Sequence, residues 1–340
     1  MASCAHARPW RQRSIRIGCM GTVVALAGQV GGAKLADGFY RLRGKDLAII
    51  VNTGDDFEHL GLAFSPDIDT MLYTLAGIAS PSAGWEPENE TRAAYEMLKR
   101  LGGPAVPALG DKSLAAPILR AQGLAAEQSL TAITRDFCRR LGIAARVLPM
   151  SDDRVRTNVL TAEGAITFNE YFSELGCDPP VQGFQYAGAE DARISDEVLD
   201  ALHAADLEAV VLCPANPYHA INPILAAGGL REVIRGRGAP VVAVSPIVGG
   251  RALKGSAGKM MRELGREPSA RGVAGEYLRL IDGFVIDNED AAYVENVRSL
   301  GIEVLAAPTI MRSVEDRTAL AQAILDFAGT LREKRAAEVE

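Results

Sequence analysis

The chain has 340 residues, of which 48% are hydrophobic and 23% charged, enough to form one large or two modest globular domains. Its net charge of −7 argues against a general nucleic-acid binder, whose affinity would depend on clustered Lys and Arg. No apolar run approaches the roughly 20 residues that a membrane-spanning helix needs. The five scattered cysteines form no C-x-x-C pair and indicate reduced thiols in a cytoplasmic protein.

Residues 1–20 are basic, show no periodic pattern and lack the apolar core of a secretory signal. We expect a disordered extension here. The alternatives are a transit-like leader, or an upstream start with Met20 as the natural first residue.

The first regular element is predicted at residues 22–27, TVVALA, a short apolar run rich in β-branched residues. A glycine-rich turn follows, and then a helix with Leu35, Phe39 and Leu42 on one face. This order is typical of the opening unit of a nucleotide-binding α/β fold. Glycines allow the backbone to approach a phosphate, and a helix N-terminus favours an anion. The candidate phosphate-binding residues are Gly28, Gly31, Gly32 and Lys34. The turn matches neither G-x-G-x-x-G nor a P-loop, so a purely structural turn stays open.

The second predicted strand, residues 47–53, leads into an acidic stretch at residues 51–77. Carboxylates at the carboxyl end of a buried strand lie where open α/β sheets bind ligands, and they can hold Mg²⁺ or accept a proton from a hydroxyl. The alternative is a polar loop in which Ser65 or Asp67 only caps the following helix. The polar residues of the stretch are Asp55, Asp56, Glu58, His59, Ser65, Asp67 and Asp69.

Residues 78–144 carry helical patterns and predict an insertion that forms a lid or side domain. Asp111 and Lys112 lie at a helix start, where simple capping is one interpretation. From residue 145 a strand and a hairpin with a turn at Glu163 and Gly164 are expected. Apolar strands then alternate with amphipathic helices.

This order predicts a doubly wound, Rossmann-like α/β fold with a mostly parallel sheet. Its core should comprise residues 21–77 and 145–335, with 78–144 as the helical insertion. Right-handed crossovers bring the loops after the strands to one edge of the sheet. His59, His203 and His219 form no zinc pattern with the cysteines. The expected edge residues are Gly28 to Lys34, Asp55 to His59, Asn216, Gly249, Gly250, Lys254 and Lys259.

The stretch NTGDDFEHLGLAFSPDIDTMLYTLAG, residues 52–77, resembles the signature of the 2-phospho-L-lactate transferase family, and the resemblance runs from about Thr22 to the final helix. These enzymes complete the core of the deazaflavin coenzyme F420. The resemblance implies two substrates: a guanosine diphosphate that bears a three-carbon acid, and the deazaflavin FO. A ribityl hydroxyl of FO would attack the phosphorus carrying the acid, and GMP would leave. It also implies a homodimer.

On this basis Asp55, Asp56 and Asp69 are expected to serve Mg²⁺ and the attacking hydroxyl, with Asp55 and Asp56 as the metal ligands. Which acid is the base stays open. FO should lie along the helix of Asp69 and beside Lys112. The guanosine diphosphate should lie on a larger set, namely Gly28, Gly31, Gly32, Lys34, Asn216, Gly249, Gly250, Lys254 and Lys259.

Three points stay open from the sequence. The family usually has a glycine where this chain has Gln29. The acid transferred can be phospholactate, phosphoenolpyruvate or phosphoglycerate. The alternative function is a non-catalytic nucleotide-sugar-binding regulator of the same fold. If Asp69 is catalytic, Asp69→Asn should lower kcat at least about a hundredfold and leave the melting temperature unchanged, since Asn caps a helix nearly as well as Asp.

Overall fold

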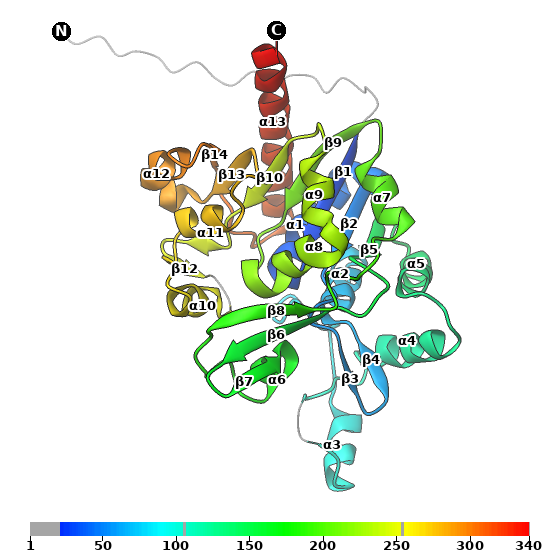
Figure 1. Ribbon diagram of the computed structural model, residues 1–340. Coiled ribbons are helices and arrows are strands. Elements are labelled where there is room, and N and C mark those ends of the chain that lie inside the picture. The colour runs from blue at the N-terminus through cyan, green and yellow to red at the C-terminus, as the bar shows by residue number, and fades with distance from the viewer. Residues whose placement is uncertain (1–20, 105–106, 253–254, 340) are drawn as a thin grey trace, which may run out of the picture.

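The computed structural model describes residues 21–104, 107–252 and 255–339. Its centre is a seven-stranded sheet in the order β14-β13-β10-β9-β1-β2-β5, in which every neighbouring pair is parallel (Figure 1). The predicted doubly wound α/β fold is confirmed. The strands of this sheet are β1 (Thr22–Ala27), β2 (Leu47–Val51), β5 (Arg146–Pro149), β9 (Leu207–Leu212), β10 (Val241–Val244), β13 (Gly283–Ile286) and β14 (Glu303–Ala306).

The strands read as continuous apolar runs because helices cover both faces of the sheet. Every residue of β1 and β2 is buried. Successive side chains of a strand point to opposite faces, so Val23 and Ala25 pack into one core cluster while Val24 and Leu26 pack into the other. Two separate hydrophobic layers therefore hold the sheet.

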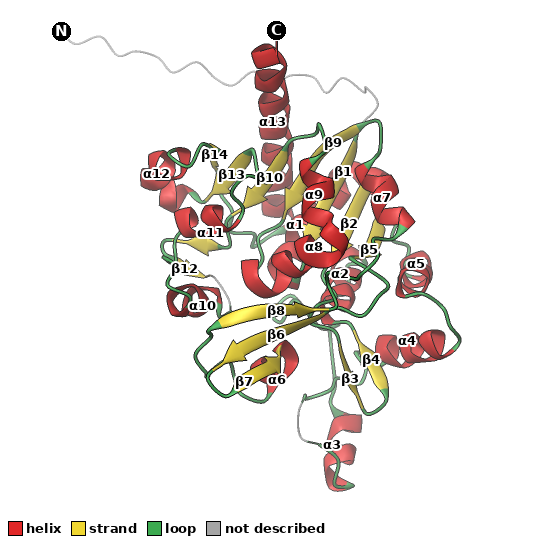
Figure 2. Cartoon of the chain, in the orientation of Figure 1, coloured by secondary structure: helices red, strands yellow, loops and turns green. Residues whose placement is uncertain are grey.

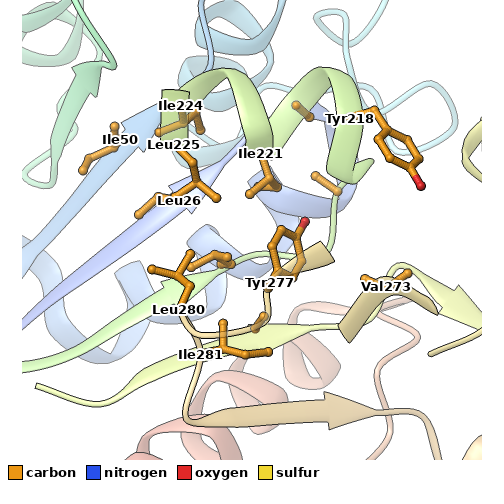
Figure 3. Packing of buried hydrophobic residues seen from close by; sticks show 14 of the residues in the cluster. Leu26, Ile50, Tyr218, Ile221, Ile224, Leu225, Val273, Tyr277, Leu280 and Ile281 are labelled. Carbon is orange, nitrogen blue, oxygen red and sulfur yellow. The ribbon is translucent and has the colours of Figure 1, made fainter. Parts of the chain in front are cut away.

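Helices lie around the seven-stranded sheet (Figure 2, helices in red). The helices on one face share a hydrophobic cluster with Val23 and Ala25. The first group is α1 (Gln29–Arg43), α2 (Pro66–Leu75), α5 (Leu130–Arg140) and α13 (Val314–Val339). Opposite them, Leu26 and Ile50 pack with Ile224 and Leu225 (Figure 3). The helices that contribute to this second cluster are α6 (Phe168–Ser173), which packs on β6 and β7, and α7 (Asp196–Leu202), α8 (Asn222–Ala226), α9 (Leu230–Arg235), α10 (Ala257–Glu263), α11 (Ala270–Glu276) and α12 (Val294–Arg298).

Three small sheets accompany the main one. The predicted hairpin is confirmed: β6 (Arg156–Thr161) pairs antiparallel with β7 (Gly164–Thr167). Two features were not predicted. Strand β8 (Gly183–Ala187) adds to this hairpin, and β3 (Phe57–His59) pairs with β4 (Leu62–Phe64) through a turn with positive φ at Leu60 and Gly61. The third small sheet is β11 (Ile247–Val248) with β12 (Arg251–Ala252).

The described residues between 78 and 144 include the helices α3 (Ala93–Arg100), α4 (Ala115–Ala125) and α5. Helix α3 has no buried residue and lies far from the seven-stranded sheet (Figure 1). Helix α5 instead buries Cys138 in the core cluster beside β5. Residues 1–20, where a disordered extension was expected, lie outside the described residues. Among the helices that the structure describes, none is both long and apolar enough to cross a bilayer.

The strand order reverses between β1 and β9. From β1 the chain proceeds to β2 and β5 on one side, and β9, β10, β13 and β14 follow on the other. Ligands of open α/β sheets bind outside the carboxyl ends of the strands at such a switch point. The segments that begin at Gly28, Asn52 and Cys213 leave β1, β2 and β9 at this place.

Candidate active site

Gln29 links the segments that follow β1 and β9. Its φ of 58° is in the left-handed region, which a non-glycine residue rarely adopts. Its backbone N–H donates to Oδ1 of Asp67 over 2.8 Å, and its side-chain Oε1 accepts from the N–H of Asn216 over 2.8 Å. Its Nε2 lies 3.2 Å from Nε2 of His219. The side-chain amide of Gln29 therefore connects the segments after β1 and β9 at the switch point.

These contacts fix the tautomer of His219. Because the Asn216 N–H can only donate, Gln29 presents its oxygen there and its NH₂ group to His219. Nε2 of His219 must then accept, so Nδ1 carries the proton and donates to Oδ2 of Asp55 over 2.8 Å. The Phe168 ring stacks on the imidazole at 3.8 Å between centroids. His219 is thus a neutral donor that orients Asp55.

Asp55 and Asp56 each keep one buried carboxylate oxygen without a hydrogen-bond partner, Oδ1 in both cases. The other oxygen of Asp56 accepts from the Ser65 hydroxyl over 2.7 Å. Burial raises the pKa of Asp56 to about 8, against the smaller opposing effects of Ser65, Arg156 and Arg120. A buried acceptor without a donor is rare and indicates a missing partner.

The orphan oxygens fit a hard cation. Among the residues that the structure describes, no three His, Cys, Asp or Glu side chains gather closely enough to hold a metal by themselves. Mg²⁺ does not need such a cage, because it commonly takes one or two carboxylates and completes its shell with substrate phosphates and water. Asp55 and Asp56 are suited to that arrangement through their unpartnered Oδ1 atoms.

Asp67 joins Asp55, Asp56 and Gln29 in what is called the aspartate cluster below, and its side chain does not cap α2. Its two oxygens accept from the Gln29 N–H and from Nδ2 of Asn52, the latter over 2.9 Å. Burial, with a further contribution from the charge of Asp55, raises the pKa of Asp67 to about 6. Ser65 also forms no side-chain cap, since its hydroxyl binds Asp56. Ser65 thus occupies the N-cap position of α2, but neither its side chain nor that of Asp67 caps the helix.

Asp69 forms a buried ion pair with Arg120 of α4, whose side chain is 1% exposed. Nη2 of Arg120 donates to Oδ1, Nη1 lies 3.3 Å from Oδ2, and Nη1 also donates to the Ala63 carbonyl over 2.9 Å. Burial raises the pKa of Asp69, and the guanidinium opposes that effect. The pair joins α2 to the segment 78–144.

We expect the metal-free protein to lose stability as pH rises, because of Asp56. Its pKa is about 8 in the folded chain and near the model-peptide value of about 4 when unfolded. The folded state thus retains a proton that the unfolded state releases. This contribution is complete below about pH 4 and is lost as pH passes through 8. Thermal melts in a chelating buffer across this range measure it.

Asp56→Asn is the matched control for that experiment. Its amide keeps an oxygen for the Ser65 hydroxyl and cannot ionise. The variant should show a flatter dependence of melting temperature on pH between about 6 and 9. An equally steep decline in the variant would assign the effect to another group.

The glycine segment lies largely inside α1, which begins at Gln29. A Cβ at Gly28 would lie 2.6 Å from Oδ2 of Asp67, and one at Gly31 would lie 2.4 Å from the Pro214 carbonyl oxygen. A Cβ at Gly32 would press on Ala27. These glycines allow close packing at the switch point, while their role toward phosphate stays a prediction. Lys34 donates to the Met311 carbonyl over 3.1 Å.

The remaining predicted residues are spread over several elements. Asn216 lies in the cluster, where its Oδ1 accepts from the Tyr218 N–H. Lys112 donates to the Glu88 carbonyl over 2.6 Å within the segment 78–144. Lys259 donates to the Tyr171 hydroxyl and the Pro179 carbonyl and pairs with Glu263. Gly249 and Gly250 have positive φ after β11, and Lys254 lies outside the described residues.

Three residues of the cluster were missed from the sequence: Gln29, His219 and Arg120. Arg120 is the single charged residue of α4, AAPILRAQGLA, and that isolation was a usable signal. His219 follows a buried strand at the predicted ligand-binding edge, and that position was a usable signal although His219 fits no zinc pattern. Gln29 was noted as a departure from glycine without a role.

Known proteins that resemble this chain identify its family. Residues 23–312 match the model of the family described as 2-phospho-L-lactate transferase CofD. A phosphoenolpyruvate transferase from Streptomyces griseus is 40% identical over 317 residues, which cover 91% of this chain and 99% of the relative. A 2-phospho-L-lactate transferase from Methanopyrus kandleri is 39% identical over 312 residues, which cover 89% of this chain and 96% of the relative.

A crystal structure of a Bacillus halodurans protein has a TM-score of 0.59 and 16% identity, and the match covers 90% of this chain and 98% of that one. At this identity the likeness supports the fold alone. The family match and the relatives both extend over most of the chain. The chain therefore belongs to the 2-phospho-L-lactate transferase family, whose members are transferases of coenzyme F420 biosynthesis.

Proposed function

We propose that this protein transfers a phosphorylated three-carbon acid from its guanosine diphosphate conjugate to the deazaflavin FO and releases GMP. The observation that carries the proposal is the pair of buried, unpartnered carboxylate oxygens of Asp55 and Asp56 at the end of β2. Such oxygens can bind a divalent cation or accept a proton from a hydroxyl, and both tasks belong to phosphoryl transfer.

Phosphoryl transfer depends on positioning and on neutralising charge. Mg²⁺, when bound through Asp55 and Asp56, would neutralise the phosphates of the donor. His219 holds Asp55 in one orientation, so its free oxygen is preset toward a ligand. Arg120 holds Asp69 at the start of α2. Asp69 would then orient or deprotonate the FO hydroxyl from a fixed position.

The substrate positions follow the sequence-based prediction. The guanosine diphosphate would lie by Gly28, Asn216 and the loop of Gly249 and Gly250, and FO would lie along α2 toward Lys112. The switch point between β1 and β9 supports the first placement, since ligands of this fold class collect there. A homodimer in the cytoplasm completes the proposal, and light scattering on the purified protein measures the dimer.

The transferred acid is identified by comparing donors. A relative named phosphoenolpyruvate transferase is 40% identical to this chain and one named 2-phospho-L-lactate transferase is 39% identical, so similarity does not choose between their acids. The test is to supply FO with guanylated phospholactate, phosphoenolpyruvate or phosphoglycerate and to measure GMP. The donor with the highest kcat/KM identifies the natural acid.

We expect GMP release to require both FO and Mg²⁺. A chelator should abolish turnover, and added Mg²⁺ should restore it, because the orphan oxygens of Asp55 and Asp56 would otherwise face the donor phosphates without a counter-charge. Full turnover in a metal-free assay would contradict the metal role. Nucleotide binding without FO-dependent GMP release from any donor would contradict the transferase and favour the regulator.

A further inference from the structure

A cavity of about 370 Å³ opens on the small sheet β7-β6-β8. Arg156 is opposite Ala187 in the register, and Asn158 is opposite Thr167. Alternate residues of a strand share a face, so these side chains gather on one side of the sheet, while Thr157 and Val159 are buried on the other. The lining residues are Arg154, Arg156, Asn158, Thr167, Ala187 and Gly188.

The cavity adjoins the aspartate cluster. The N–H of Thr157 donates to the Gly54 carbonyl over 2.7 Å, so β6 begins beside the turn that carries Asp55 and Asp56. The charge of Arg156 acts on Asp56, where it opposes the larger effect of burial on the pKa of that carboxyl. A molecule held at Asp56 can therefore extend into the cavity.

Two guanidinium groups whose charges act on each other line the cavity, and the nearest acids, Asp56 and Glu58, act on Arg156 without forming an ion pair with it. Arg154 is exposed, and Arg156 is half-buried and donates to the carbonyl of its own neighbour Val155 over 2.8 Å. In the described part of the chain, neither arginine forms an ion pair, whereas the nearby Arg193 pairs with Asp153. Burial lowers the pKa of Arg156, and the charge of Arg154 adds to that effect, whereas the charges of Asp56 and Glu58 oppose it. Adjacent cations that repel each other favour a bound anion.

We infer that Arg154 and Arg156 form the subsite for the carboxylate of the donor's three-carbon acid. This inference rests on the proposed function. The donor carries phosphates and one carboxylate. The phosphates have a cation site at Asp55 and Asp56, whereas the carboxylate has no counter-charge there. The planar fork of arginine matches a carboxylate through two parallel hydrogen bonds. Because all three candidate acids carry this group, the subsite serves each of them.

The test compares two ligands that differ by the acid. Calorimetry with guanosine diphosphate and with guanylated phospholactate is performed on the parent, Arg154→Ala and Arg156→Ala. Each variant should weaken binding of the guanylated acid about tenfold or more, the effect expected of a lost charge-assisted hydrogen bond. Affinity for guanosine diphosphate should change less than about twofold. Arg156→Lys should recover only part of the loss, since lysine lacks the fork.

Arg193→Ala is the matched control. It removes the same charge from a nearby exposed side chain that pairs with Asp153 and does not line the cavity. It should leave both affinities at the parental values. Arg154 is exposed, so its variant is expected to fold even if Arg156→Ala does not.

Equal losses for both ligands would overturn the inference, because the arginines would then hold phosphate. Parental affinity for the guanylated acid in both variants would also overturn it. A parent that releases no GMP from any guanylated acid with FO would instead refute the proposed function, and that outcome is read on the parent alone.

Discussion

Asp69→Asn is expected to destabilise the protein by about 3 kcal/mol and to lower kcat at least about a hundredfold. The first effect follows from Arg120, which is 1% exposed and would remain charged without its carboxylate. Removing one partner of a buried ion pair typically costs about 3–5 kcal/mol. The second effect follows from the proposed role of Asp69 toward the FO hydroxyl. Denaturant titration measures the first, and FO-dependent GMP release the second.

A double-mutant cycle separates these two effects. Arg120→Met should destabilise less than Asp69→Asn, because burial raises the pKa of Asp69 and the orphaned carboxyl can take up a proton. Asp69→Asn combined with Arg120→Met removes both charges and should recover much of the stability, while kcat stays low. A single Asp69→Asn variant with parental stability would show that the ion pair contributes little.

The structure changes what the sequence predicted for this residue. From the sequence, Asp69→Asn was expected to leave the melting temperature unchanged, because Asn caps a helix nearly as well as Asp. That expectation considered only α2. The partner lies on α4, and no local pattern around SPDIDT indicates it. A contact between distant elements depends on how the segment 78–144 folds back on the sheet.

The main fold was more accessible to prediction. Strands β1 and β2 are short apolar runs buried on both faces, and helices with apolar faces pack on each side of the sheet, so local patterns and the crossover rule indicated the architecture. Strand β8 escaped because its burial does not alternate, since four residues of GFQYA are half-buried and only Gln185 is exposed. The hairpin of β3 and β4 escaped because three-residue strands are too short to show a period.

Some residues of the site could likewise be predicted from the sequence, and others could not. Asp55 and Asp56 could be placed because they follow a buried strand directly. The contact of Gln29 with Asn216 and His219 could not, since it requires a positive φ that no sequence rule assigns to glutamine. The tautomer of His219 depends in turn on that contact. Sequence identifies the carboxylates, whereas the chain of donors that orients them emerges only from the folded backbone.

Asp55→Asn is expected to keep the parental melting temperature and to lose turnover by at least about a hundredfold. The amide oxygen of Asn can still accept from Nδ1 of His219, so the hydrogen bond of 2.8 Å is preserved. Its NH₂ group then takes the place of the unpartnered Oδ1. A donor at that position can neither bind a cation nor accept a proton. An unchanged melting temperature for Asp55→Asn and a lowered stability for Asp69→Asn would thus distinguish the two residues.

His219→Phe is the companion variant, because it keeps a ring against Phe168 while it removes the donor to Asp55 and the acceptor for the Gln29 amide. Loss of a group that orients a metal ligand typically lowers metal affinity or activity about 10–100-fold. His219→Phe should therefore lower kcat less than Asp55→Asn, and saturating Mg²⁺ should recover part of its activity. Thermal melts and GMP release at several Mg²⁺ concentrations measure both variants. Near-parental turnover of Asp55→Asn with an intact fold would remove Asp55 from the chemistry and leave it as the partner of His219.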